Sequence, residues 1–451
     1  MKILLVNKFF YRKGGSETYL FALADGLRAM GHEVAFFSMH HPKNYQSKWN
    51  KYFVSEKDYN GNISAFRKAK EALTIAYSPE AKCKFEALLE DFQPDIIHLN
   101  LVHRQLTFSI LDAPYLKKHR VPVVYTAHDY SLICPVYTML NGKGKICDAC
   151  VHGDFSNVIK NVCTKGSKAK SILSYLEAEF LRWHKSYDKI DLIIACSQFM
   201  KNKLDEAGYA DRTACMQNFL TEAQLSMGRK VSNMHKFKDE ADGARPYFLY
   251  FGRLSREKGI LTLVRAFLNA TGTDSSNDAV DATIPENWDL HIVGDGPERV
   301  SIERIIRQAG PEAARRIKLL GYKTGEDLQC EVGNARFSVL PSEWYENMPY
   351  SGLESLAAQT PVIGTRIGGI PELVVQNETG FGVVPGEVDA LRDILIVTSQ
   401  VDCIRYAQMQ ASCMEYVKRY CSQGRYVDAL TDLYRTLGMT SRIGPRTEKV
   451  L

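Results

Sequence analysis

Two glutamates stand on either side of a predicted helix start. Glu346 and Glu354 are eight positions apart in WYENMPYSGLESLAAQTPVIGTRIGGIPEL, residues 344–373. Pro349 lacks the N–H group that a first helical turn leaves unpaired, so a helix is predicted to begin there. Glu346 then lies on the preceding loop and Glu354 in the second turn, some distance along the helix axis. Two carboxylates placed in this way can bind the two ends of one elongated ligand.

The helix start between these acids can also bind an anion, because its first N–H groups are free. An anion held between two carboxylates suits a nucleotide-diphosphate sugar. The phosphates would lie on the backbone amides, the ribose on one acid and the sugar on the other. The alternative is an ordinary solvated helix with two surface glutamates, which is the commoner outcome for an isolated pair.

Two cations follow another predicted strand. Arg253 and Lys258 lie in GRLSREKG, at the carboxyl end of a strand, where open α/β sheets bind ligands. An arginine fork and a lysine point charge can share the oxygens of a diphosphate. A solvated basic turn is the alternative.

Three smaller features also lie at the carboxyl ends of predicted strands. Gly14 and Gly15 follow the first strand, and His128 ends VVYTAH. Paired glycines let a ligand approach backbone amides at a helix start, and a histidine can orient a sugar hydroxyl. Gly294, in VGDGP, occupies another turn between a strand and a helix. A plain turn or a packed histidine would explain each of them equally well.

Four of the eleven cysteines are clustered in one segment, residues 134–165. Cys134, Cys147, Cys150 and Cys163 include one Cys-x-x-Cys pair, and four thiolates could hold a structural zinc. The segment has little apolar periodicity, so a metal would help to hold it together. Reduced thiols without a ligand, or a redox role, are the alternatives that remain open.

The elements that position these residues alternate between apolar strands and helices. Strands are predicted at 2–7, 33–38, 95–100, 121–129 and 191–197, and again at 246–254, 288–296, 317–322, 335–342 and 360–366. Their apolar runs are continuous, which favours parallel strands buried on both faces and therefore doubly wound α/β sheets.

The chain is long enough for two domains. We predict a first domain over 1–225, a linker over 226–245 and a second domain over 246–404. The segment from about 405 to 440 is expected to pack back on the first domain. We find neither a signal peptide nor a membrane span in the sequence, so we expect a cytoplasmic protein.

The net charge of +5 is unevenly distributed, because residues 1–220 hold 30 Lys and Arg against 22 Asp and Glu. No nucleic-acid motif accompanies the basic half. Apolar residues of 171–189 share one helical face near several lysines, which indicates peripheral contact with an anionic membrane. The alternatives are a solvated basic surface and packing of the apolar residues on the sheet. The lysines are Lys143, Lys145, Lys160, Lys165, Lys168 and Lys170.

Taken in order, GGSE, TAHD, GRLSREKG, VGDGPE and the segment around Glu346 resemble the retaining GT-B glycosyltransferases of family 4. This family includes many bacterial polysaccharide and lipopolysaccharide sugar transferases. The resemblance implies two facing Rossmann-like domains with a cleft between them. The second domain would bind a nucleotide-sugar donor, and the first a glycan or lipid-linked acceptor.

The resemblance also implies roles for individual residues. Glu346 would contact the donor sugar and Glu354 the ribose, whereas Arg253 and Lys258 would neutralise the leaving nucleotide. Gly15 would approach the phosphates, and His128 would lie beside the sugar. The diphosphate would bind backbone N–H groups in the segment Asn347, Met348, Pro349 and Tyr350, in which Pro349 itself has no N–H group.

No catalytic metal or other cofactor is expected. The chain has no Asp-x-Asp motif, which metal-dependent transferases of another fold use to hold a divalent ion. Two alternatives to a transferase remain. One is a nucleotide-sugar epimerase of the same fold, and the other is a non-catalytic binding protein.

Overall fold

A computed structural model of the chain describes residues 1–56, 74–226, 228, 245–272 and 283–443. It comprises two compact units, residues 1–218 with 423–451 and residues 219–422. Each unit contains a six-stranded sheet with the orders β2-β1-β3-β4-β5-β6 and β12-β11-β10-β7-β8-β9. All the strand pairs within these sheets are parallel. The doubly wound α/β class predicted from the sequence is confirmed.

The first unit alternates its strands and helices. The strands are β1 (Lys2–Val6), β2 (Glu33–Phe37), β3 (Ile96–Leu99), β4 (Val123–Ala127), β5 (Leu192–Ala195) and β6 (Thr213–Cys215). The helices are α1 (Gly15–Ala29), α3 (Pro79–Phe92), α4 (Pro114–His119), α5 (Asn157–Lys160), α6 (Lys168–Trp183), α7 (Gln198–Leu204) and α17 (Gln423–Ile443).

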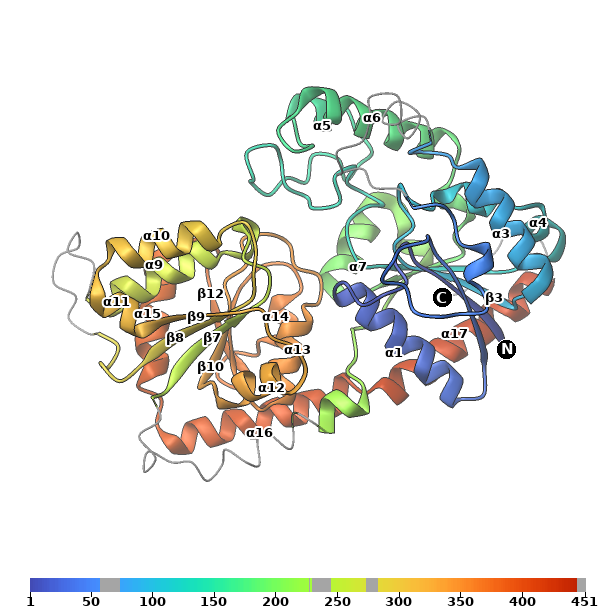
Figure 1. Cartoon of the computed structure of the whole chain (residues 1–451). Helices are drawn as coiled ribbons and strands as arrows, with labels where there is room; N and C mark the ends of the chain where they lie inside the picture. Colours follow the sequence, from blue (N-terminus) through green and yellow to red (C-terminus); the bar gives the residue numbers. More distant parts are fainter. Residues whose placement is uncertain (57–73, 227, 229–244, 273–282, 444–451) are drawn as a thin grey trace. The chain divides into compact units, whose positions relative to one another are not determined.

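The second unit repeats this plan (Figure 1). Its strands are β7 (Tyr247–Phe251), β8 (Asp289–Val293), β9 (Ile317–Gly321), β10 (Phe337–Leu340), β11 (Val362–Thr365) and β12 (Gly380–Val383). Its helices are α9 (Ile260–Ala270), α10 (Arg299–Gln308), α11 (Pro311–Arg316), α12 (Gly325–Asn334), α13 (Tyr350–Ala357), α14 (Ile370–Leu373), α15 (Val388–Ser399) and α16 (Cys403–Tyr420).

Strand β7 shows why its sequence is apolar at every position. Phe248 and Tyr250 pack in a core with α9 and α15, whereas Tyr247 and Leu249 pack on the other face with Val332 of α12. Both faces of the strand are covered, so neither can be polar.

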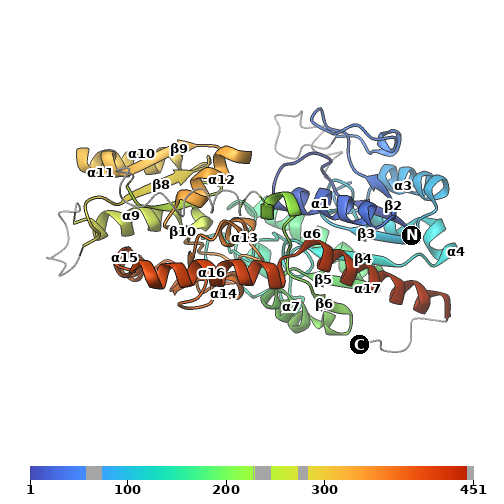
Figure 2. The same cartoon turned by 90° about the horizontal axis from the view of Figure 1, so that it is seen from below.

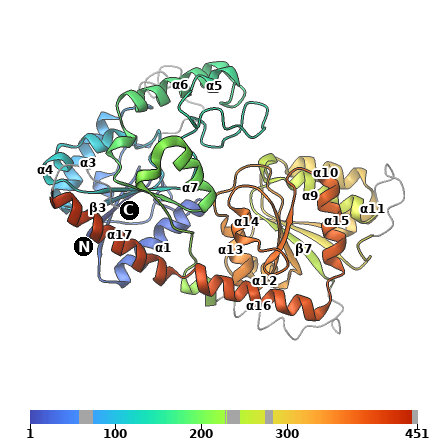
Figure 3. The ribbon, with the colours of Figure 1, turned by 180° about the vertical axis from the view of Figure 1, so that it is seen from behind.

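The last two helices belong to different units. Helix α16 packs against α13 in the second unit (Figure 2), whereas α17 lies beside α1 in the first unit (Figures 1 and 3). The expectation that all of 405–440 packs on the first domain is therefore wrong for α16, whose Tyr406 and Met409 belong to the second unit's core. Most of the predicted linker, residues 226–245, lies outside the described residues.

Helix α17 joins the first unit through a buried polar network. The Tyr434 hydroxyl lies 2.5 Å from His98 Nδ1, and His98 Nε2 lies 2.6 Å from Thr126 Oγ1. The Tyr19 and Tyr426 hydroxyls are 2.7 Å apart. Burial lowers the pKa of His98 to about 3, so the imidazole is neutral and uses both ring nitrogens.

Replacing Tyr434 with Phe leaves His98 with a buried ring nitrogen that lacks a partner. A buried polar atom of this kind costs about 1–3 kcal/mol, so we expect the Tm to fall by several degrees. Tyr420→Phe is the control, because Tyr420 is 49% exposed. Equal Tm values for both variants in a thermal melt would contradict the role of the network.

Candidate functional site

Lys258 and Glu346 meet at the carboxyl ends of two neighbouring strands. Lys258 ends the turn η7 (Arg256–Lys258) after β7, and Glu346 lies on the loop after β10. Strands β7 and β10 pair directly, so their following loops are adjacent. The Lys258 Nζ atom lies 2.5 Å from Glu346 Oε1.

Glycines hold both loops at this distance. Gly259 has φ +67°, and a Cβ atom there would lie 1.7 Å from the carbonyl oxygen of Pro341 at the end of β10. Gly368 has φ +60°, and its Cβ would lie 2.2 Å from the Glu346 carbonyl oxygen. The Gly369 N–H donates to that same oxygen at 2.7 Å. Only glycine fits these close contacts between backbones.

The Glu346 carboxylate has one occupied oxygen. Its Oε1 accepts hydrogen bonds from Lys258, from Ser342 Oγ at 2.7 Å and from Trp344 Nε1 at 2.9 Å. Among the described residues, no hydrogen bond to Oε2 is formed. Burial raises the pKa of Glu346, but the charge and hydrogen bond of Lys258 outweigh it, so the pKa lies below its usual value. The site therefore holds an oriented carboxylate with one oxygen available to a ligand.

Arg253 follows the same strand as Lys258 but does not join the pair. Its side chain is exposed, and its carbonyl oxygen accepts a hydrogen bond from the Tyr250 hydroxyl at 2.7 Å. Within the described part of the chain, its guanidinium group forms no hydrogen bond or ion pair. Of the two predicted cations, Arg253 is therefore the one whose charge is available, whereas Lys258 already neutralises Glu346.

Helix α13 begins as the sequence predicts. Pro349 precedes its first residue with φ −69°. Tyr350 is that first residue, whereas Asn347 and the buried Met348 lie on the loop. Glu354 lies on this helix, and its Oε1 accepts a hydrogen bond from Gln224 Nε2 at 3.4 Å. Burial raises the pKa of Glu354 to about 7, so this carboxyl titrates near neutrality.

Gly294 has a packing role in the same unit. Its φ is +137°, and a Cβ atom there would lie 1.9 Å from the Gly252 carbonyl oxygen. The loops after β7 and β8 thus contact each other through two glycines. Donor binding by Gly294 stays a prediction.

The remaining predicted residues lie in the first unit. His128 follows β4, and its Nε2 lies 2.9 Å from Asn100 Oδ1, at the end of the neighbouring β3. Burial lowers the pKa of His128 to about 3, so it is a neutral donor to Asn100. The buried Asn100 Nδ2 atom has no hydrogen-bond partner in the described residues. Sequence reasoning missed Asn100, although it ends a predicted strand.

Gly15 is the first residue of α1, and Gly14 directly precedes the helix. Two residues further on, Glu17 is buried, and its Oε1 accepts a hydrogen bond from Asn7 Nδ2 at 3.1 Å. Burial raises the pKa of Glu17 above its usual value. The glycine turn thus lies beside a buried carboxyl group at the end of β1. The sequence analysis included Glu17 in the GGSE motif but gave it no role.

Similar proteins identify the class of this fold. Residues 13–221 match the family described as Glycosyltransferase Family 4, and residues 232–400 match Glycosyl transferases group 1. The crystal structure of Anabaena HepE in complex with UDP and glucose has a TM-score of 0.64 and 16% identity, covering 97% of this chain and 100% of that chain. The fold is therefore that of the GT-B glycosyltransferases. Both matched families are glycosyltransferases, and family 4 is the one that residues 13–221 match.

Two relatives have names that mention gene regions or polysaccharides. An uncharacterized 42.6 kDa protein in the cps region of Klebsiella pneumoniae is 24% identical over 385 residues, which is 83% of this chain and 87% of that protein. The amylovoran biosynthesis glycosyltransferase AmsK of Erwinia amylovora is 23% identical over 297 residues, 61% of this chain and 67% of that protein.

Proposed function

We propose that this glycosyltransferase moves a hexose from a nucleotide-diphosphate sugar to a hydroxyl group of a glycan or lipid-linked acceptor in cell-surface polysaccharide synthesis. The transfer retains the anomeric configuration and needs no metal ion. The observation that carries the proposal is the Glu346 carboxylate, which is fixed through Oε1 and open at Oε2.

The local chemistry supports this proposal. Departure of the nucleotide develops negative charge on the diphosphate, and preorganised cations and amides stabilise that charge more in the transition state than in the ground state. Arg253 supplies the available cation, and the start of α13 supplies amides. Because Glu346 is hydrogen-bonded and paired with Lys258, it suits orientation of the donor sugar better than nucleophilic attack. Retention then follows from attack of the acceptor hydroxyl on the face that the nucleotide leaves.

The relatives support the choice of substrates. HepE was crystallised in complex with UDP and glucose, and the name of AmsK places that enzyme in amylovoran biosynthesis. A UDP-sugar is therefore the first donor to test, and a polysaccharide intermediate is the first acceptor class.

A donor screen tests the proposal. Purified protein is melted with UDP-, GDP- and ADP-sugars, and we expect one group of donors to raise the Tm. Arg253→Ala should reduce that shift, whereas Arg299→Ala, whose partner is the exposed Glu303, should preserve it. The selected donor is then incubated with lipid-linked acceptor fractions, with and without added Mg²⁺ or Mn²⁺. NMR of the product should show that the anomeric configuration of the donor is retained. The rate of transfer should be equal with and without the added metal ion.

Other outcomes would overturn the proposal. Inversion at the anomeric carbon or an absolute need for a divalent ion would remove the corresponding part of the mechanism. Epimerised sugar from the donor alone would favour the epimerase. Absence of a Tm shift with every nucleotide sugar would leave a protein without a donor site.

Glu354 gives the proposal a pH signature. If its carboxylate accepts hydrogen bonds from the ribose, the deprotonated form binds the donor, and its pKa in the free protein is about 7. We therefore expect the affinity for a nucleotide sugar to rise between about pH 6 and 8 and to level off above that range. The diphosphate of a nucleotide sugar does not itself titrate there. Calorimetry with Glu354→Gln should give weaker, pH-independent binding, and an unchanged pH profile would exclude the ribose contact.

Peripheral membrane contact is part of the proposed function, and helix α6 supplies its surface. The buried residues of α6 include Ser171, Ser174 and Glu177, whereas Ile172, Leu176 and Trp183 are 42%, 55% and 78% exposed. Three apolar side chains of this helix are thus exposed, whereas Leu181 is buried and Phe180 contacts the rings of Tyr77 and His184. Helices α5 and α6 lie together in the first unit (Figures 1 and 3).

Charge makes an anionic bilayer the proposed occupant of this surface. Lys165, Lys168 and Lys170 are exposed beside the start of α6, and lysines near a bilayer favour acidic headgroups. Among the described residues, we find no helix that is both long and apolar enough to cross a bilayer.

Sedimentation with vesicles tests the membrane contact. We expect binding to vesicles that contain acidic lipids, a steep decrease with salt, and loss of binding in Leu176→Glu with Trp183→Glu. Val300→Glu with Ile404→Glu is the control, because these residues are also exposed apolar side chains, at 74% and 77%. Equal recovery in the supernatant with acidic and neutral vesicles at low salt would exclude this surface.

A further inference from the structure

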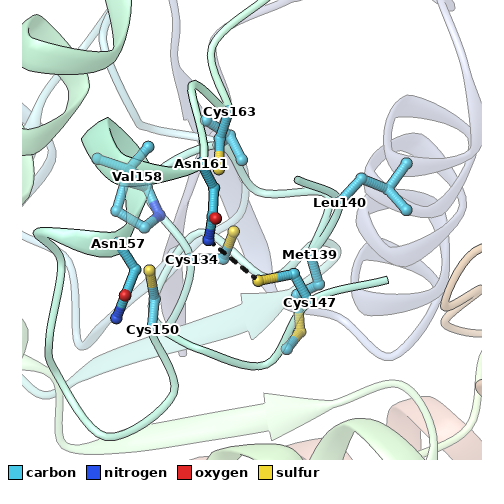
Figure 4. A pocket seen from close by; sticks show the side chains of 11 residues that line it. Cys134, Met139, Leu140, Cys147, Cys150, Asn157, Val158, Asn161 and Cys163 are labelled. Carbon is cyan, nitrogen blue, oxygen red and sulfur yellow. Dashed lines mark hydrogen bonds between the residues drawn. The ribbon is translucent and has the colours of Figure 1, made fainter. Parts of the chain in front are cut away.

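The four clustered cysteines surround one small cavity of the first unit. Cys134, Cys147, Cys150 and Cys163 all line a cavity of about 10 Å³ (Figure 4). A space of this size holds about one water-sized sphere. These cysteines come from four places in residues 134–163, and the fold brings all four to the lining of the same cavity.

A hairpin and a turn produce this convergence. Leu140 and Ile146 pair in antiparallel fashion, and the Cys147 N–H donates to the Met139 carbonyl oxygen at 2.9 Å. The Gly142 N–H donates to the Asn161 carbonyl oxygen at 3.0 Å. A Cβ atom at Gly142 would lie 2.4 Å from the Val162 carbonyl oxygen. This close contact sets the hairpin that leads into Cys147 against the turn that leads into Cys163.

The segment has little regular secondary structure. Between Cys134 and Lys165 the helix α5 has four residues, and Tyr137, Met139, Val162 and Lys165 have φ between +47° and +57°. Positive φ is costly for residues other than glycine, most of all for a β-branched residue such as Val162, and it persists where the surroundings enforce it. A cross-link beside Val162 would enforce it.

We propose that Cys134, Cys147, Cys150 and Cys163 bind one structural zinc ion as four thiolates. In the described residues, no three His, Cys, Asp or Glu side chains already stand in coordinating positions. The thiol groups must therefore turn into the cavity as the metal binds. His152 is not a ligand, because it is 73% exposed and lies 3.5 Å from Glu206.

The charge of the segment fits this product. Binding of Zn²⁺ by four thiols releases four protons to solvent and gives a centre of charge −2. Residues 134–165 contain four lysines and two aspartates, a net charge of +2. Four protein ligands leave no open coordination position, so the zinc would be structural. It would stabilise the loop from which α6 begins.

Elemental analysis of the purified full-length chain tests the proposal. We expect about one equivalent of zinc, and X-ray absorption should show sulfur ligands alone at about 2.3 Å. Cys147→Ser with Cys150→Ser should lose the zinc and lower the Tm. Cys83→Ser with Cys403→Ser is the control, because both cysteines are exposed. This variant should retain the zinc and the wild-type Tm. None of these readouts depends on sugar transfer.

A second measurement uses wild-type protein, so that the test does not depend on whether the cysteine variants fold. Wild-type protein is denatured with a chromophoric chelator and a thiol reagent. One equivalent of released zinc with all eleven thiols free supports the site. A metal-free preparation with eleven free thiols, a disulfide within the cluster, or zinc with nitrogen or oxygen ligands would each overturn it.

Discussion

Replacing Lys258 with Ala should lower kcat/KM on the order of 10²-fold or more, as the loss of a preorganised charge usually does. It should also destabilise the second unit by about 3 kcal/mol, because the buried Glu346 carboxyl group would have to stay charged without its cation or take up a proton. The structure therefore predicts two effects of one substitution, one on catalysis and one on stability.

A double variant separates these effects. Lys258→Met with Glu346→Gln removes both charges at similar volume, so the Tm should return toward the wild-type value while activity stays low. Steady-state kinetics and thermal melts measure the two quantities. Recovery of activity together with stability would show that the pair serves only the fold, and near-normal transfer by Lys258→Ala would exclude a catalytic role for the pair.

The second large effect is expected for Gly259→Ala. A Cβ atom would lie 1.7 Å from the Pro341 carbonyl oxygen in a backbone with φ +67°. Backbone cannot yield as a flexible side chain does, so the loops of Lys258 and Glu346 must separate. We expect a loss above about 3 kcal/mol, which lowers the Tm by roughly 6–12 °C or more.

Gly310→Ala is the matched control for Gly259→Ala. Gly310 also has positive φ, +93°, but no atom lies within 4 Å of its added Cβ. It should cost only the backbone strain, about 1–2 kcal/mol. A similar decrease in Tm for both variants would show that the collision is relieved elsewhere. A larger decrease for Gly259→Ala, accompanied by loss of transfer, would confirm that this contact positions Lys258.

Much of the fold could be predicted from the sequence, because buried parallel strands leave continuous apolar runs such as YFLYF in β7. Strands β6 and β12 were missed. TAC and GFGV are too short and too weakly apolar to stand out from loops. The division of the last two helices between the units was also missed, because α16 and α17 follow each other closely and both are amphipathic.

The site was only partly predictable for a related reason. Strand ends and glycine turns led to the candidate ligand-binding positions, which stay predictions, whereas the helix start at Pro349 was correct. The sequence placed Lys258 on a diphosphate, whereas the structure pairs it with Glu346. That contact depends on the pairing of β7 with β10 in the sheet and on the close approach of the Gly259 backbone to Pro341. Neither can be read from residues 88 positions apart.

The position of α17 also has a consequence for synthesis on the ribosome. The helix completes the first unit, yet residues 219–422 are translated before it. At about 5–20 residues per second, these two hundred residues take roughly 10–40 s. During that interval Tyr19 and His98 of the nascent chain lack their partners Tyr426 and Tyr434. The unit that begins the protein is therefore the last to be finished, and the apolar surface under α17 must avoid aggregation until the helix emerges.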